Sequence, residues 1–567
     1  MLNRWFARHP ASRPPRRFLL TLLAALLALG WVIHDDYGFA WDEFNDRNLG
    51  IATAHYVAKR LVPDRWQHLV PNDPRISWLP TSGIVHGPVV EAPAAALGRF
   101  LYPGNPRGYY TVRHGFVFLV FVAGVLALYG LGWLRFRDWR LALLGASILV
   151  LSPRFFAEAF YNGKDVGFMA LFTVAMFTLT WLLRRPTAGR VLLHALATGA
   201  AIGVRMPGVL LPALTLAWLG WQAWQEQPGW KRTRLWGLAG LYVVAAPAAT
   251  VALWPYLWET PLASFRYVLG VMSQVPWPCT VLYWGHLVPA PALPWHYLPV
   301  MVLVTTPVPY VLAALLGSAA VTGRAWQRRS QHWALALQFD ALFAAWLGLP
   351  LLAIVVLHSV VFDGWRHVYF IYPGLLLLAV RGVQVLSRWA CAPHSSPGVK
   401  RKALARLALG AGAASLLHTA YWQIQAHPNQ QAYFSCVPSE AAERLFERDY
   451  WALGNRYGLE WLLANDQRPV LTVTGPRPVL LYASWLLLAP AQQQRIRVVY
   501  DTTARYYMDG YRWHPQSYAD TLGPEVLAYR PGGAVKILSV FRREPRKRPL
   551  PNPSNGLVPK HASAAIR

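Results

Sequence analysis

Long apolar runs alternate with short polar connections along most of the chain. Eleven runs are candidates for membrane-spanning helices: 18–34, 113–134, 139–153, 166–183, 190–204, 207–222, 235–253, 297–317, 341–359, 368–386 and 404–423. A straight span needs about 20 residues, so the shorter runs have boundaries uncertain by a few residues. The pattern predicts a polytopic α-helical membrane protein with about eleven transmembrane helices.

Positive charge is concentrated in every second connection. Five arginines precede the first run: Arg4, Arg8, Arg13, Arg16 and Arg17. Later basic connections carry Arg135, Arg137 and Arg140, then Arg184, Arg185 and Arg190, then Lys231, Arg232 and Arg234, then Arg324, Arg328 and Arg329, and finally Arg388, Lys400, Arg401, Lys402 and Arg406. Because cytoplasmic loops are enriched in Lys and Arg, the N-terminus is expected in the cytoplasm and the C-terminus outside.

Two apolar segments have an alternative interpretation. The stretch Val85 to Leu101 contains Glu91 and two prolines, and counting it as a span would exchange the sides of all later loops. We therefore expect a helix lying at the outer interface. The first run could also be a cleaved signal peptide, but no clear small-x-small site follows it, so retention is favoured.

The composition agrees with a membrane protein. Hydrophobic residues make up 55% of the 567 positions and charged residues 14%, whereas soluble domains are about 25% charged. The 28 Trp residues suit interfacial aromatic belts. A net charge of +28 could indicate nucleic-acid binding, but the basic residues fall largely in the short connections. We therefore expect membrane lipids, and no nucleic acid, as partners.

The pattern changes beyond the last apolar run. Short β-rich segments (469–474, 496–500 and 535–540) alternate with helical patterns (453–464 and 479–488), which predicts a small α/β extracytoplasmic domain. Four regions result: a basic cytoplasmic N-terminus (1–17), a transmembrane region (18–424), the outer domain (425–541) and a basic tail (542–567) expected to be disordered.

The three cysteines define no redox or metal motif. Cys279 and Cys436 are expected outside, where disulfides form, and Cys391 inside. The count is odd and there is no C-x-x-C, so unpaired cysteines are favoured, and whether Cys279 and Cys436 pair stays open.

Ionisable residues gather in the outer loops. Asp42 and Glu43 follow the first span, and the second outer loop contains Arg154 and ends with Lys164 and Asp165. Charged groups at membrane depth cost roughly 2.5 to 3.5 kcal/mol on insertion scales and therefore tend to be functional. Asp35 and Asp36 are interpreted instead as solvated loop charges.

This arrangement resembles the GT-C membrane glycosyltransferases, and within them the protein O-mannosyltransferase and lipid A aminoarabinose transferase type. The resemblance covers nearly the whole chain and includes an Asp-Glu pair in the first outer loop and a later Asn-Gly-Lys-Asp. Further similar stretches are Ser152-Pro153-Arg154-Phe155-Phe156, Leu293-Pro294-Trp295-His296-Tyr297 with Thr305-Thr306-Pro307, and Arg366-His367-Val368-Tyr369-Phe370. An Asp-Glu dipeptide alone is a weak signal, and its place in the topology is what makes it specific.

The resemblance implies transfer of a sugar from a polyprenyl-phosphate donor to a glycan, lipid or protein acceptor. Because the similar stretches resemble those of bacterial members, it also implies location in a bacterial inner (plasma) membrane. A carboxylate would act as the base for the acceptor hydroxyl, and cations would stabilise the departing phosphate. By motif position the base is Asp42, Glu43 sets its orientation or that of the acceptor, and Asp165 helps to hold the acceptor or a metal.

Further residues are expected to bind substrate. Candidates for the phosphate are Lys164, Arg154, Arg205, Arg366 and His367, and His86 is a candidate for lining the site. Arg205 could equally be a helix-end residue, and Arg366 a topological arginine. His296 could line the lipid-phosphate cleft or belong to an aromatic belt with Trp295 and Tyr297.

Two alternatives from other classes stay open. A transporter or lipid-linked sugar flippase would also be polytopic, but transporters show internal repeats and mid-span polar residues, and the sequence shows neither. No essential cofactor is expected, although Asp42, Glu43 and Asp165 could bind a divalent cation if they converge. The sugar and the acceptor are not specified by the sequence.

Overall fold

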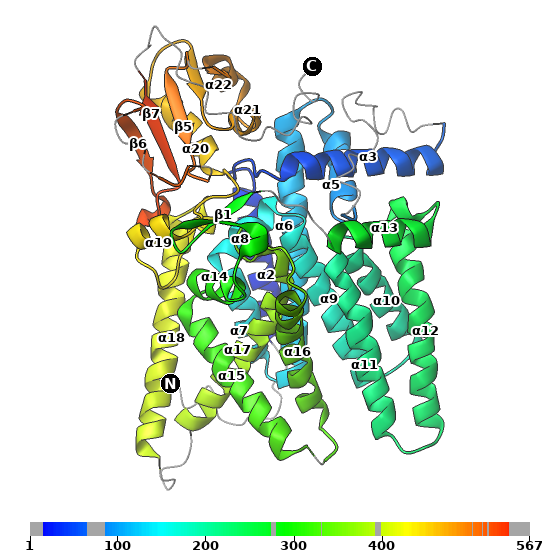
Figure 1. Ribbon diagram of the computed structural model, residues 1–567. Helices are drawn as coiled ribbons and strands as arrows, with labels where there is room; N and C mark the ends of the chain where they lie inside the picture. The colour runs from blue at the N-terminus through cyan, green and yellow to red at the C-terminus, as the bar shows by residue number, and fades with distance from the viewer. Residues whose placement is uncertain are drawn as a thin grey trace.

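The computed structural model describes residues 15–64, 86–273, 279–329, 331–391, 398–501, 503–512, 514–516, 518 and 521–543. Long helices stand side by side as a bundle, and a small β-sheet lies beyond one end of it (Figure 1). We call this end of the bundle the sheet end. The predicted N-terminal residues 1–14 and the tail beyond 543 lie outside the described residues.

Eight helices in the described ranges are long and apolar enough to cross a membrane. They are α2 (Arg16–Ile33), α6 (Pro106–Phe136), α9 (Asp165–Arg184), α12 (Trp230–Leu253), α15 (Val308–Gln327), α16 (Leu335–Val356), η4 (Arg366–Ile371) continued by α17 (Tyr372–Ala390), and α18 (Val399–Gln425). A ninth is counted if α7 (Trp139–Val150) and α8 (Pro153–Tyr161), bent by 67°, form one span. The polytopic helical class is thereby confirmed.

The predicted count of eleven is larger because it includes shorter helices. All eleven predicted runs are helical, but α10 (Ala188–Ile202) has 15 residues and α11 (Leu210–Gln225) has 16. At 1.5 Å per residue these helices are roughly 22 to 24 Å long, against a hydrocarbon core of about 30 Å. Crossing by α10 and α11 stays a prediction.

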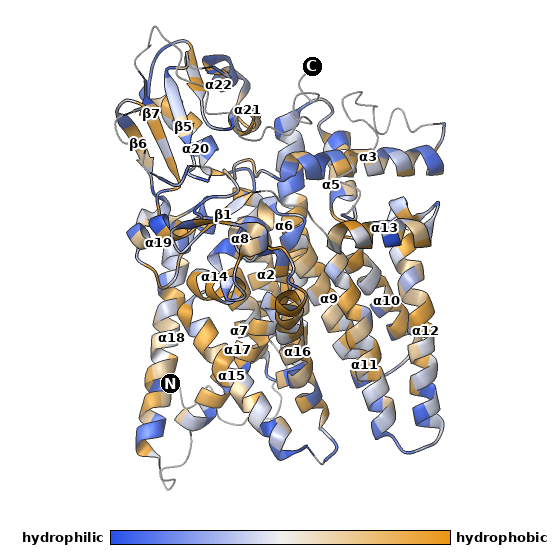
Figure 2. Cartoon of the chain, in the orientation of Figure 1, coloured by the Kyte–Doolittle hydropathy of each residue, from blue (hydrophilic) through white to orange (hydrophobic). Residues whose placement is uncertain are grey.

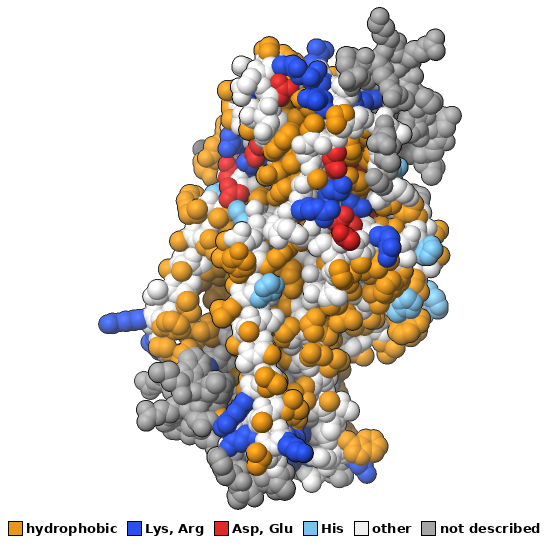
Figure 3. All heavy atoms as spheres, turned by 90° about the vertical axis from the view of Figure 1, so that its left-hand side faces the viewer, with side chains coloured by type: hydrophobic (Ala, Val, Ile, Leu, Met, Phe, Trp, Pro, Cys, Tyr) orange, Lys and Arg blue, Asp and Glu red, His pale blue; other side chains and the backbone are white. Residues whose placement is uncertain are grey.

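The two ends of the bundle differ in polarity. The α11–α12 and α15–α16 connections lie together at the end opposite the sheet, and the residues there are hydrophilic (Figures 1 and 2). On the face shown in Figure 3, Asp and Glu side chains lie only in the half of the molecule that carries the sheet, whereas the opposite end carries Lys and Arg. This asymmetry agrees with the loop-charge pattern of the sequence.

Short helices cover the sheet end of the bundle. Helix α3 (Glu43–Leu61) lies across the ends of the long helices, and α13 (Pro261–Ser273) lies below it (Figure 1). Helix α5 (Glu91–Leu101) packs on α3 and on α6. Its 11 residues are too few to span a bilayer. The helix predicted within 85–101 is therefore present, although residue 85 lies outside the described residues.

Close helix packing in the bundle depends on small residues. Helices α15 and α17 meet at Gly317 and Gly382, where an added methyl group would collide with the carbonyl oxygen of Leu378 or Ala313. Such contacts between small residues let helix backbones approach closely, which drives association where water contributes little.

The C-terminal domain contains a five-stranded sheet in the order β4-β3-β5-β7-β6. The strands are β3 (Leu471–Thr474), β4 (Ile496–Val498), β5 (Tyr506–Asp509), β6 (Glu525–Tyr529) and β7 (Leu538–Arg542). β3 is parallel to β4 and β5, whereas β7 is antiparallel to β5 and β6. The predicted strands correspond to β3, β4 and β7, while β5 and β6 were not predicted.

Helix α20 (Gly454–Asn465) packs on this sheet. Leu459 of the helix forms a hydrophobic core with Leu471, Met508 and Val540 of the strands. The remaining elements are η1 (Met206–Val209), η2 (Pro255–Leu257), β1 (Thr280–Tyr283), β2 (His286–Pro289), η3 (Ala290–Ala292), α14 (Tyr297–Thr305), η5 (Gln430–Ala432), α19 (Ser439–Leu445), α21 (Pro478–Trp485), α22 (Pro490–Arg495) and η6 (Pro531–Gly533). The two predicted helices of the domain correspond to α20 and α21.

Candidate functional site

The segment before α3 is fixed between the bundle and the C-terminal domain. Arg456 on α20 donates from Nη1 to the carbonyl oxygens of Asp35 and Tyr37. The amide of Trp41 donates to the carbonyl of Trp451 over 3.1 Å. These bonds hold the backbone just before Asp42, so the position of Asp42 depends on the C-terminal domain.

Asp42 lies between two cations. Its Oδ2 accepts from Arg366 Nη1 at 2.7 Å and lies 3.1 Å from Lys164 Nζ, with 15% of the side chain exposed. Burial acts to raise the pKa of Asp42, but the charges of Lys164 and Arg366 outweigh it and hold the pKa far below its ordinary range. Asp42 is therefore ionised in the unliganded protein.

Asp165 begins α9 and belongs to the same cluster. Its side chain is buried and forms an ion pair with Arg205, and Arg366 Nη1 lies 3.4 Å from its Oδ2. Asn162 Nδ2 donates to that oxygen at 3.1 Å, and Asn162 Oδ1 accepts from the amide of Asp165 at 2.8 Å. A carboxylate at a helix N-terminus is also favoured by the helix dipole.

One guanidinium therefore connects the two predicted acidic residues. Arg366, at the start of η4, contacts both Asp42 and Asp165, and its Nη2 donates to Asp363 at 2.8 Å. Only 7% of its side chain is exposed. We call Asp42, Lys164, Asp165, Arg205 and Arg366 the charged centre.

Glu43 points away from the charged centre. It accepts from Arg113 Nη1 at 2.7 Å and from the amide of Ala40 at 2.8 Å, and lies 2.9 Å from His114 Nε2. This geometry makes Glu43 a buried anchor for the first turn of α3. The expectation that Glu43 orients Asp42 stays a prediction.

Arg113 organises a second, fully buried layer. Besides Glu43 it donates to Glu91 through Nε at 2.9 Å and Nη2 at 2.7 Å, and to the carbonyl of Tyr161 at 2.9 Å. The loop that carries Lys164 packs directly on this layer, because an added methyl group at Gly163 would collide with Glu91 Oε1. Sequence reasoning missed Arg113 and Glu91, although a carboxylate inside an apolar stretch was a usable signal.

Asp46 lies one helical turn after Asp42 and shares Lys164 with it. The distance from Lys164 Nζ to Asp46 Oδ1 is 3.5 Å, and 7% of the Asp46 side chain is exposed. Burial, together with the nearby charge of Glu91, raises the pKa of Asp46 to about 7, although Lys164 opposes this shift. With this raised pKa, Asp46 changes its protonation state near neutral pH, next to Lys164 of the charged centre.

Two of the predicted histidines lie beside the charged centre. Burial and the positive charges of Lys164 and Arg205 hold the pKa of His86 well below its ordinary value, so its ring is neutral. His367 follows Arg366, and its ring packs edge-on against Phe362 with centroids 4.5 Å apart. Both rings have a buried Nδ1 without a hydrogen-bond partner among the described residues.

Arg154 and His296 lie in different surroundings. Arg154 Nε donates to the carbonyl of Tyr433 at 3.0 Å, and its guanidinium lies over Phe434. His296 Nδ1 lies 2.7 Å from the hydroxyl of Tyr283. Among the described contacts, neither side chain reaches the charged centre.

The expected solvated aspartates are about half exposed, and both have partners. Asp35 accepts from Arg107 at 2.9 Å and Thr111 at 2.7 Å, with 40% of its side chain exposed. Asp36 lies 2.9 Å from His427 Nε2.

Residues of the C-terminal domain and of α8 complete the surroundings. The ring of Trp451 lies 5.0 Å from the guanidinium carbon of Arg366. Glu158 on α8 accepts from Asn162 at 2.7 Å, from Tyr369 at 2.9 Å and from Tyr450 at 3.3 Å. The segment 449–455 had no expected role, and the structure places it against Arg366.

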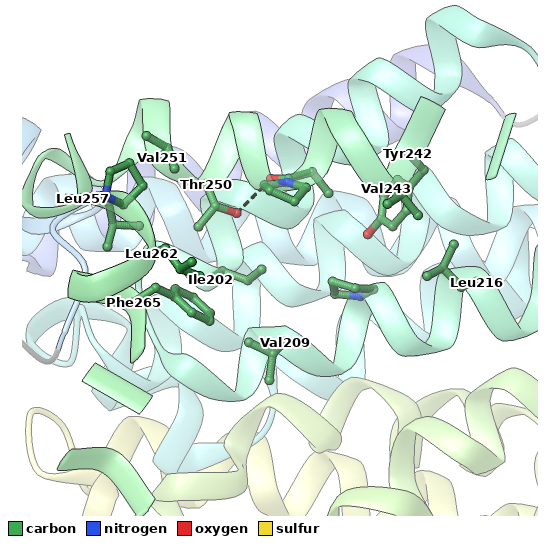
Figure 4. A pocket seen from close by; sticks show the side chains of 14 residues that line it. Ile202, Val209, Leu216, Tyr242, Val243, Thr250, Val251, Leu257, Leu262 and Phe265 are labelled. Atoms are coloured by element: carbon green, nitrogen blue, oxygen red, sulfur yellow. Dashed lines mark hydrogen bonds between the residues drawn. The ribbon is translucent and has the colours of Figure 1, made fainter. Parts of the chain in front are cut away.

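A largely apolar cavity of about 470 Å³ lies between α10, α11, α12 and α13. Figure 4 shows Ile202, Val209 and Phe265 at one part of its wall and Leu216 and Tyr242 at another. Arg205 lies in the chain between Ile202 and Val209, so the cavity adjoins the turn that carries this member of the charged centre.

Neither a metal cluster nor a disulfide occurs among the residues that the structure describes. They contain no group of three or more His, Cys, Asp or Glu side chains arranged to hold a metal ion. Cys279, Cys391 and Cys436 are free thiols.

The chain shows limited likeness to solved membrane glycosyltransferases. It is similar to the apo oligosaccharyltransferase of Archaeoglobus fulgidus (11% identity, TM-score 0.45), covering 84% of this chain and 64% of that chain. It is also similar to ArnT from Cupriavidus metallidurans bound to undecaprenyl phosphate (16% identity, TM-score 0.45, 92% of this chain and 98% of that chain). At these identities and scores, no residue role is carried over.

No curated protein matches the chain. The family model of dolichyl-phosphate-mannose-protein mannosyltransferases matches residues 93–261. This segment includes Arg154, Lys164, Asp165 and Arg205 but not Asp42. The resemblance that the loop motifs predicted is therefore confirmed over residues 93–261, the part of the chain that matches the dolichyl-phosphate-mannose-protein mannosyltransferases.

Proposed function

We propose that this chain is an integral membrane glycosyltransferase. It moves a sugar from a polyprenyl-phosphate donor to an acceptor hydroxyl or phosphate at the extracytoplasmic face of the membrane. The observation that carries this proposal is the contact of one guanidinium, that of Arg366, with both Asp42 and Asp165. Two carboxylates and three cations thus converge on one site, and Lys164, Asp165 and Arg205 of this site belong to the segment that matches a mannosyltransferase family.

For a hydroxyl acceptor, the reaction couples one proton transfer to one substitution. The acceptor oxygen attacks the anomeric carbon, and its proton passes to the carboxylate of Asp42. The bond between the anomeric carbon and the phosphate oxygen breaks, and its electron pair leaves with the polyprenyl phosphate. Lys164, Arg205 and Arg366 stabilise this leaving anion, which is the kind of electrostatic support that contributes most to such transition states.

The low pKa of Asp42 is a property of the unliganded site. A carboxylate held by two cations is a weak base, because accepting a proton means giving up both ion pairs. A donor phosphate supplies another anion for Arg366 and Lys164. As these cations turn to the phosphate, the pKa of Asp42 rises and its carboxylate becomes a better proton acceptor. Donor binding therefore prepares the base.

The apolar cavity supports a lipid-linked donor. Its walls are almost wholly hydrocarbon, and it lies beside the turn that carries Arg205. The first isoprene units of a polyprenyl chain would bury their apolar surface there, since burial of such surface contributes roughly 25 cal/mol per Å². The phosphate would then lie towards Arg205.

Side chains supply the positive charge at this site, so the mechanism needs no essential metal ion. We expect full transfer activity after treatment with EDTA and removal of the chelate. A complete loss that is restored by a divalent cation would contradict this part of the proposal.

The central test does not require the sugar to be identified. The purified protein is incubated with lipids extracted from its native membrane, and mass spectrometry follows glycosylated polyprenyl phosphates and free polyprenyl phosphate. We expect conversion of the former into the latter when an acceptor extract is added, and none with Asp42→Asn. Uptake of lipid-linked sugar into proteoliposomes without cleavage would support a flippase or transporter instead.

A further inference from the structure

Asp363 connects the charged centre to the C-terminal domain. Its Oδ2 accepts from Arg366 Nη2 at 2.8 Å, and its Oδ1 accepts from Arg512 Nη2 at 2.5 Å. Only 4% of the Asp363 side chain is exposed. The carboxylate is thus shared between a cation of the membrane bundle and a cation from the other domain.

The backbone at this position is held in an unusual conformation. Asp363 has a φ of 55° and the following Gly364 a φ of 71°, both in the left-handed region. A non-glycine residue rarely adopts this conformation unless its surroundings fix it. Arg366 and Arg512 hold the Asp363 side chain, and Tyr297 accepts from the amide of Gly364 at 2.9 Å.

Arg512 follows strand β5 and forms a fork between two partners. Its Nη1 donates to the carbonyl of Tyr450 at 2.7 Å while its Nη2 binds Asp363, and 11% of its side chain is exposed. Tyr450 precedes Trp451, whose ring lies beside Arg366. Arg512 therefore fixes both the carboxylate that holds Arg366 and the segment that packs on it.

We propose that Arg512 is a positioning residue for the transfer reaction, acting through Asp363 to hold the Arg366 guanidinium against Asp42. The site is then complete only when the C-terminal domain is docked on the bundle. This inference rests on the proposed function for its kinetic test, and a second test does not depend on it.

Loss of Arg512 has a defined electrostatic consequence. Asp363 is nearly fully buried and would keep Arg366 as its remaining strong ion-pair partner. A buried carboxylate that loses one of two cations attracts the other more strongly, because unpaired charge in the interior is costly. The Arg366 guanidinium would therefore turn towards Asp363 and away from Asp42.

The kinetic test compares Arg512→Ala with Arg448→Ala. Arg448 is a part-buried arginine of the same domain that donates to the backbone carbonyls of Lys536 and Pro515, so it controls for domain stability. We expect Arg512→Ala to lower kcat by up to about 100-fold, the loss that a misplacement of about 1 Å in an active site can cause. Arg448→Ala should leave kcat within about threefold of the parent value even if thermal inactivation is faster.

Arg512→Lys should recover only part of the loss, because an ammonium lacks the planar fork that binds Asp363 and Tyr450 together. A kcat that is unchanged in Arg512→Ala, or lowered equally in Arg448→Ala, would overturn the proposal.

The second test reads the Arg366–Asp42 contact without turnover. In a background with Cys279, Cys391 and Cys436 replaced by Ser, Asp42→Cys places a thiol beside Arg366 and Lys164. Neighbouring cations lower a thiol pKa from about 8.5. The pH dependence of its reaction with a small methanethiosulfonate reagent should therefore show a lowered pKa, and adding Arg512→Ala should raise it.

An unchanged thiol pKa in the Arg512→Ala background would contradict the positioning role even if the kinetics agreed. A raised thiol pKa in the Asp42→Cys, Arg512→Ala protein, combined with no sugar transfer by the parent protein that keeps Asp42, would support the positioning role and reject the proposed function. The two hypotheses can therefore fail separately.

Discussion

Arg366 Nη1 lies 2.7 Å from Asp42 Oδ2, although 324 positions separate these residues in the sequence. The contact joins the segment before α3 to the residues that open the η4–α17 helix. In the proposed mechanism it pairs the base with a cation and places the group that binds the donor phosphate next to the group that activates the acceptor. Loss of the Asp42 side chain should therefore impair activation of the acceptor. Loss of the Arg366 side chain should impair use of the donor.

Asp42→Asn should abolish transfer while expression and membrane insertion stay intact. The amide keeps the shape of the side chain but cannot accept the acceptor's proton, so we expect a loss of about 10² to 10⁴ in kcat. Turnover of glycosylated polyprenyl phosphate by the purified variant measures this loss.

Asp35→Asn is the matched control in the same loop. Asp35 is partly exposed and pairs with Arg107 rather than with the charged centre. Exposed ion pairs contribute at most about 1 kcal/mol, so near-normal activity is expected. Near-normal turnover by well-folded Asp42→Asn would exclude this residue as the base.

Arg366→Ala should weaken use of the donor more than use of the acceptor. In the proposed mechanism the guanidinium stabilises the leaving phosphate, and removing one preorganised donor of this kind costs about 10² to 10³ in rate. Initial rates at varied donor and acceptor concentrations separate the two effects.

Lys164→Ala is the comparison for this measurement. Lys164 contacts Asp42 and Asp46 as well as facing the site, so its loss is expected to affect both substrates. Unchanged donor dependence in folded Arg366→Ala would remove Arg366 from phosphate binding.

The sequence contained enough information for the helices and for the main members of the charged centre. Hydropathy identifies apolar helices because side chains that cross a membrane must be apolar, and charges beside such helices are rare enough to indicate function. Asp42, Lys164 and Asp165 stood out on this basis, whereas Arg205 and Arg366 were candidates through the family resemblance, and the structure brings all five together.

Other features depend on contacts that a linear pattern does not contain. Neighbouring positions 42 and 43 look equivalent in sequence, but the turn at the start of α3 directs Glu43 towards buried Arg113. Arg113 itself resembled an ordinary helix-end arginine. Strand β5 was missed because its side chains alternate only partly in polarity, and its place depends on pairing with β3 and β7.

The proposed topology predicts where reporters will be active. A reporter fused after Trp422, at the end of α18, should be active outside the cytoplasm, whereas fusions near Arg185 and Arg328 should report inside. The reason is the alternating loop charge, together with the acidic side chains that Figure 3 shows only in the half of the molecule with the sheet. A cytoplasmic C-terminal domain would separate the charged centre from an extracytoplasmic acceptor and would overturn the location of the reaction.

Donor affinity should fall as the pH rises through about 7, the pKa to which burial raises Asp46. Below this pH Asp46 is neutral, and Lys164 is shared only between Asp42 and the donor phosphate. Above it the Asp46 anion competes for Lys164, 3.5 Å away, so the KM for the donor should increase. The amide of Asp46→Asn is neutral at every pH, so this variant should show a nearly flat donor KM between about pH 6 and 8. Asp42 does not titrate in this range in the free enzyme, because its pKa lies far below it. A donor KM that rises equally in both proteins would show that another group controls the pH dependence.

The raised pKa of Asp46 also has a consequence for stability. A folded-state pKa above the unfolded value of about 3.9 means that the folded protein binds the proton more tightly. The stabilisation is fully present below the unfolded pKa and is lost as the pH rises through the folded pKa of about 7. Thermal stability should therefore decrease between about pH 4 and 7 in the parent protein, and this decrease should be smaller in Asp46→Asn. Thermal inactivation of both proteins across this range measures the difference, and equal decreases would show that Asp46 does not carry the shift.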